Sequence, residues 1–61
     1  MTKYEMNYKA RLDEMFDEVI HKYGFEHHAT IYFAEMHEKY YNQPNYENRE
    51  KMEKIFKGLM K

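Results

Sequence analysis

Two breaks divide this chain of 61 residues into three stretches with helical periodicity. Gly24 directly follows the first stretch, and a helix commonly stops where glycine supplies a left-handed backbone conformation. The second break, residues 42–45, reads Asn-Gln-Pro-Asn, and its proline disfavours helical geometry at the residue before it. Short connections between amphipathic helices predict an all-α fold, a small antiparallel three-helix bundle that forms one domain over residues 1–61.

The expected helices cover about residues 3–23, 26–42 and 46–60, where apolar residues recur at helical spacing. The start of the second helix is indistinct because no Ser, Thr, Asp or Asn directly precedes it, and Thr30 is an alternative, later cap. Asn45 is the expected N-cap of the third helix. Three Glu–Lys pairs four residues apart predict salt bridges along its exposed side: Glu47–Lys51, Glu50–Lys54 and Glu53–Lys57.

The second helix is apolar on two faces, although a small bundle needs only one. The stripe expected in the core is Phe25, Ala29, Tyr32, Phe33, Met36 and Tyr40. A second set, which we call the Ile31 strip, lies nearly opposite and comprises His27, Ile31, Ala34, Glu38 and Tyr41. This strip is core if the other two helices pack on opposite sides of the second helix, and a docking surface if all three apolar stripes meet at one axis.

The composition favours a fold that gains stability from self-association or from a partner. A chain of this size buries only about 60 % of its unfolded surface, and without cysteine it has no disulfide and no thiolate zinc site. Seven tyrosines and six methionines suit an interface, although small helical cores use the same residues. No apolar run approaches the roughly 18 residues of a spanning helix, so we expect a soluble, cytoplasmic protein without a membrane segment.

Charge favours a protein partner over nucleic acid. Ten basic and eleven acidic side chains give a net charge of −1, which argues against a phosphate-binding surface over the whole domain. The first helix carries an acidic patch away from its apolar stripe: Asp13, Glu14, Asp17 and Glu18. Such a patch is either a solvated helix face or a surface for a partner's basic groove, including a groove that normally receives nucleic acid.

Direct nucleic-acid binding is the less favoured alternative. A helix-turn-helix-like arrangement would use the third helix and the residues Asn48, Arg49, Lys51 and Lys54. Glutamates interleave with these bases, and beyond Asn48 and Arg49 the helix offers few side chains suited to base edges.

The sequence gives little support to catalysis or cofactor binding. Its four histidines form no HExxH motif and no pair at i,i+4, so we expect no metal site and no cofactor. No Gly-rich phosphate loop, nucleophile elbow or Ser/His/Asp arrangement is visible, and we assign no catalytic residue. An enzyme is therefore the least supported class.

The sequence thus predicts a non-enzymatic regulator or inhibitor that occludes or bridges a larger host protein through the Ile31 strip. A homodimer or self-associating structural module is the alternative, in which the strip closes on a second copy. In size and composition, the chain resembles the small inhibitors that phages and mobile elements direct at host nucleic-acid enzymes, including CRISPR effectors.

Overall fold

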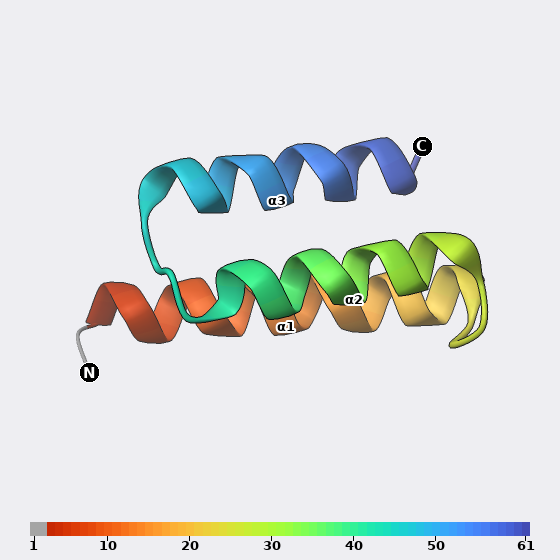
Figure 1. Ribbon diagram of the computed structural model, residues 1–61, viewed down its shortest axis with the longest axis horizontal. Helices are drawn as coiled ribbons and strands as arrows, with labels where there is room; N and C mark the ends of the chain where they lie inside the picture. Colours follow the sequence, from red (N-terminus) through yellow and green to blue (C-terminus); the bar gives the residue numbers. More distant parts are fainter. Residues whose placement is uncertain (1–2) are drawn as a thin grey trace.

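The computed structural model describes residues 3–61, which form three helices: α1 (Lys3–Tyr23), α2 (His28–Tyr41) and α3 (Tyr46–Leu59). Figure 1 shows α2 running antiparallel to α1, and α3 lying on one side of this pair and running in the direction of α1. Each helix contacts both others, which confirms the three-helix bundle. None of the three is both long and apolar enough to cross a membrane.

The first turn begins as predicted at Gly24. This residue has a φ of 88°, in the left-handed region, and its N–H donates to the Ile20 carbonyl over 2.7 Å. Its own carbonyl accepts a hydrogen bond of 2.6 Å from the buried hydroxyl of Thr30. The alternative role of Thr30 as a late helix cap was therefore wrong, because its hydroxyl closes the turn.

The predicted start of α2, near residue 26, was two residues too early. His27 is the N-cap, with an extended backbone and a ring Nδ1 that accepts the Ala29 N–H over 3.0 Å. A histidine ring can accept this bond as a Ser or Asn side chain does, but His is not among the usual capping residues. The end of α2 differs by one residue from the expected position.

The turn before α3 follows the prediction closely. Asn45 caps the helix, since its side chain accepts the Asn48 N–H over 2.9 Å. The side chain of Asn48 in turn donates to the Gln43 carbonyl over 2.9 Å, which closes the loop from inside. Helix α3 ends at Leu59, one residue before the expected end.

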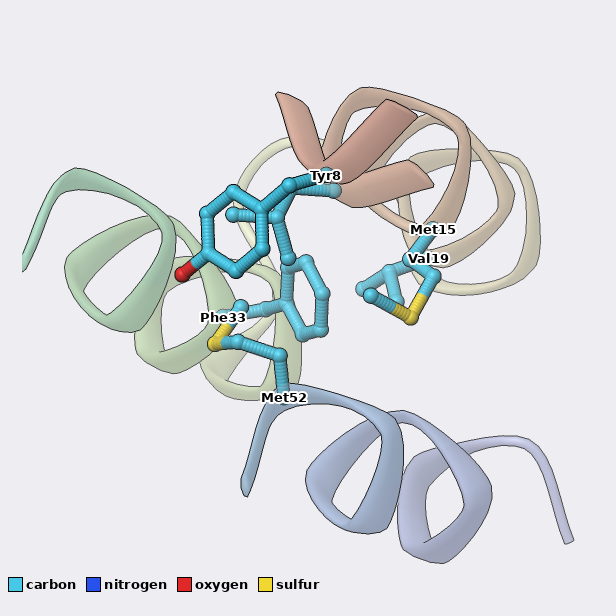
Figure 2. Close-up of a cluster of buried hydrophobic side chains, with 6 residues drawn as sticks. Tyr8, Met15, Val19, Phe33 and Met52 are labelled. Carbon is cyan, nitrogen blue, oxygen red and sulfur yellow. The ribbon is translucent and has the colours of Figure 1, made fainter. Parts of the chain in front are cut away.

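The core is built mainly on α1. Six apolar side chains are fully buried: Tyr8, Leu12, Met15 and Val19 from α1, Phe33 from α2 and Met52 from α3. In Figure 2, Phe33 lies among the α1 side chains and Met52 reaches toward it from α3. Burying a side chain of this kind contributes roughly 1.5–3 kcal/mol, so these contacts dominate the stability of the bundle.

Two residues of the stripe expected in the core are exposed, so that part of the prediction was wrong. Phe25 is 75 % exposed because it lies in the turn before α2 rather than on the helix. Tyr32 is 46 % exposed because it lies on the flank of α2, about a quarter of a turn from the core residue Phe33. Tyr41, expected nearly opposite the core, instead packs partly buried against it.

Two tyrosines of α1 satisfy carbonyl groups at the C-terminal ends of the other helices. The Tyr8 hydroxyl donates to the Tyr40 carbonyl over 2.6 Å, and burial raises the pKa of that hydroxyl above its ordinary value. The Tyr23 hydroxyl donates to the Leu59 carbonyl, which also accepts a bond of 3.1 Å from the Lys22 ammonium. These bonds use groups that the helix itself leaves unsatisfied.

A bidentate ion pair joins α3 to α1. The Arg11 guanidinium donates to both carboxylate oxygens of Glu53, over 2.7 and 3.2 Å. The predicted salt bridge of Glu53 with Lys57 was wrong, because the carboxylate turns to α1. The other two predicted pairs are not within 4.0 Å in the described part of the chain, and the Lys51 ammonium lies 5.8 Å from the centre of the Tyr40 ring instead.

The two glycines should respond in opposite directions to alanine. Gly24→Ala places a Cβ at positive φ and should lower the free energy of unfolding by about 1 kcal/mol or more. Gly58 lies within α3 with no atom near its would-be Cβ, so Gly58→Ala should raise the free energy of unfolding by about 0.5–1 kcal/mol. Urea unfolding followed by circular dichroism measures both, and equal effects would contradict the turn geometry.

The Arg11–Glu53 ion pair should make the free energy of unfolding depend on pH. The hydrogen bond from Arg11 lowers the pKa of Glu53 in the folded protein. The ion pair therefore contributes fully to the free energy of unfolding above the pKa of an unfolded glutamate, about 4.3, and this contribution is lost as the pH falls through the lower pKa of the folded state. Glu53→Gln should cost about 1 kcal/mol at pH 7 and less at pH 3. The control is Glu47→Gln on the exposed side of α3, and a cost for Glu53→Gln that does not shrink in acid would contradict the ion pair.

Candidate functional site

One carboxylate of the acidic patch on α1, that of Asp13, meets the edge of α2 that carries Tyr41 of the Ile31 strip. His37 of α2 donates from Nε2 to Oδ1 of Asp13 on α1 over 2.8 Å, since an ionised carboxylate can only accept. Asp13 belongs to the acidic patch, and His37 lies one turn before Tyr41 of the strip. We call this shared surface the α1–α2 face.

An aromatic stack supports the Asp13–His37 bond. The His37 ring packs on Tyr41 with centroids 4.8 Å apart and on Phe16 with centroids 5.3 Å apart. The ammonium of Lys9 lies 5.0 Å from the centre of the Tyr41 ring. His37 was not among the predicted site residues, because only the packing of α1 on α2 brings it to Asp13.

The members of the Ile31 strip have different surroundings. Ile31 is 50 % exposed, and Glu38, two turns further along on the same side of α2, is also exposed. Ala34 and Tyr41 are half-buried on the side of α2 that packs toward α1. His27 is exposed, and its ring is occupied in capping the helix. The strip is therefore partly a packing edge and partly an open surface centred on Ile31.

The acidic patch lies at the surface, with two of its carboxylates held in place. Asp13 bonds to His37, and Glu14 accepts from the Arg11 guanidinium over 3.0 Å. Asp17 and Glu18 are exposed, and among residues 3–61 neither lies within 4.0 Å of a basic group. All four residues of the acidic patch are exposed to solvent.

Three residues of the nucleic-acid alternative lie along α3 among glutamates, and the fourth, Asn48, is withdrawn from the surface. Asn48 is buried and bonds to the Gln43 carbonyl, which withdraws its amide from solvent. Arg49 is half-buried, Lys51 extends toward Tyr40, and Lys54 lies exposed on the outer side of α3. A shallow depression on that side mixes both charges: Tyr46, Arg49, Glu50, Glu53, Lys54 and Lys57.

Two of the four histidines have structural roles in the part of the chain that is described. His27 caps α2, its ring lies 4.5 Å from that of Tyr23, and His37 bonds Asp13. No set of three or more His, Cys, Asp or Glu side chains among residues 3–61 is arranged to hold a metal ion.

Comparison of the chain with protein-family models, with curated proteins and with solved structures found no match. The function must therefore be inferred from the chemistry of the protein's own surface.

The open part of the Ile31 strip should tolerate a charge that the core would not. Ile31→Glu should leave the bundle folded and lower the free energy of unfolding by less than about 1 kcal/mol, because the side chain is half in solvent already. Phe33→Ala, two residues away and fully buried, should cost about 3–5 kcal/mol. Thermal unfolding of both variants tests this contrast, and loss of the fold in Ile31→Glu would identify the strip as core.

Proposed function

We propose that the protein is a non-enzymatic regulator that docks on a basic surface of a larger protein through the α1–α2 face. The observation that supports this most directly is the Asp13–His37 hydrogen bond of 2.8 Å, because it brings a carboxylate of the acidic patch to the edge of α2 that carries Tyr41 of the Ile31 strip. Regulation would follow from occlusion or bridging. A bound domain covers a surface of its partner that other molecules would otherwise reach.

The face combines the two kinds of contact that protein interfaces need. Ile31 and the neighbouring Tyr32 expose apolar surface that can enter a partner's pocket. Glu35 and Glu38 lie exposed beside this pair on α2, and Asp13 of the acidic patch reaches the same helix through its bond to His37. Apolar contact supplies affinity, and the surrounding charge selects a partner of opposite sign.

The distribution of charge also favours the α1–α2 side as the one that meets a basic partner. Residues 1–45 carry eight acidic and five basic side chains, whereas residues 46–61 carry three acidic and five basic ones. A basic surface would therefore be attracted by α1 and α2 and repelled by the outer side of α3.

The size of the molecule is compatible with occlusion. Its accessible surface is 4432 Å², so a standard interface, which takes about 800 Å² from each partner, would use about a fifth of it. The long axis of 33 Å is enough to span a groove on a larger protein. A nucleic-acid enzyme offers a suitable groove, because the Lys and Arg that bind phosphates would equally attract these carboxylates.

Affinity capture with matched variants tests this function. Tagged wild-type protein should retain one dominant protein from a lysate of the source organism, and added salt should weaken the complex. Ile31→Glu and Asp17→Lys should each reduce retention by at least about tenfold. Glu47→Lys makes the same charge change on α3 and should leave retention intact.

The opposite pattern would contradict the proposal. Equal losses in Asp17→Lys and Glu47→Lys would mean that only overall charge matters, and a partner insensitive to Ile31→Glu would place the interface elsewhere. Circular dichroism of each variant shows that its fold is retained.

A further inference from the structure

Within the α1–α2 face, one aromatic ring is already in contact with a cation. The Lys9 ammonium lies 5.0 Å from the centre of the Tyr41 ring, a distance at which the ring's negative face attracts positive charge. Stacking on His37, with centroids 4.8 Å apart, keeps the Tyr41 ring in place. The ring is therefore a preformed contact for a positively charged side chain.

A carboxylate borders the same place. Asp13 lies one helical turn after Lys9, on the same side of α1, and its bond to His37 ties it to the aromatic stack. Its side chain is 58 % exposed, so the carboxylate has acceptor capacity left for a group arriving from solvent. The Lys9 ammonium itself is not within 4.0 Å of any carboxylate among residues 3–61, so it uses the ring without using Asp13.

We propose that this position, formed by Tyr41, His37 and Asp13, binds an arginine side chain of a partner protein, and that Lys9 occupies it in the free protein. The inference rests on the proposed function and specifies the residue that the α1–α2 face recognises. On binding, the arriving guanidinium displaces the Lys9 ammonium from the Tyr41 ring and takes up the Asp13 carboxylate as well.

The geometry favours arginine over lysine for a chemical reason. A guanidinium is planar and weakly hydrated, so it can stack on an aromatic ring while its N–H groups donate to a carboxylate beside the ring. An ammonium is compact and strongly hydrated, so it cannot stack on the ring and loses more hydration when it leaves water. The contact that Lys9 makes is of the weak, partly exposed kind, corresponding to about a two- to fivefold effect on binding, so a guanidinium can replace it.

The test is a titration of the full ¹⁵N-labelled chain, followed by NMR at low salt, with hexa-arginine amide and hexalysine amide as probes of equal charge. We expect hexa-arginine to bind at least about threefold more tightly and to shift the resonances of Tyr41, His37 and Asp13 most. Equal affinities, with shifts spread along all the acidic side chains, would overturn the proposal.

Lys9→Ala gives the sharper result, because it removes the side chain that competes for the ring. It should tighten hexa-arginine binding by about two- to fivefold. The control, Lys3→Ala, removes one positive charge from the same helix and should change the affinity less. Equal gains in the two variants would mean that only charge matters and would exclude displacement of Lys9.

Tyr41→Leu tests the ring itself while keeping an apolar contact with the core. It should abolish the preference for arginine over lysine and leave the weaker, charge-driven binding of both peptides. A preference that survives in this folded variant would overturn the proposal, and if the variant does not fold, the comparison of Lys9→Ala with Lys3→Ala still decides.

Failure of this site and failure of the proposed function give different results. If no partner depends on Ile31 and Asp17 while hexa-arginine still binds at Tyr41, the regulatory function fails and the arginine site stands. If a partner depends on Ile31 and Asp17 but Lys9→Ala changes nothing, the function stands and the arginine site fails.

Discussion

The structure depends on the burial of one apolar stripe of α1. This helix supplies four of the six fully buried side chains, and the remaining two, Phe33 and Met52, reach them from α2 and α3. The same helix carries Tyr8 and Tyr23, which bond to backbone carbonyls at the ends of the other two helices. Both the apolar and the polar contacts of the bundle therefore converge on α1, and they fix which of its faces remains exposed to solvent.

The sequence predicted the fold well wherever local chemistry decides it. Gly24 and Asn45 act within a few residues, so their roles in ending α1 and starting α3 could be inferred from residue type. The start of α2 could not, because a histidine ring replaced the usual capping side chain. The exposure of Phe25 followed from that shift, since a residue outside the helix does not share its periodicity.

The candidate site, too, could be predicted only where residues close in the sequence decide it. The acidic patch and the Ile31 strip could each be identified from spacing along one helix. Their contact could not, because it depends on the register between α1 and α2, which brings together Asp13 and His37 across 24 residues. Likewise, Glu53 has nearby lysines in the sequence, but its side chain is turned toward Arg11 by the packing of α3.

The uneven distribution of charge gives the molecule an electric dipole despite its net charge of −1. Its negative pole lies on the side of α1 and α2, and its positive pole lies on α3, which Figure 1 shows on one side of that pair. In the field of a strongly basic partner, a rigid body of 33 × 17 × 17 Å with this dipole rotates before contact. Its orientation at encounter, and so the fraction of collisions that are productive, would depend on ionic strength even where the final affinity does not.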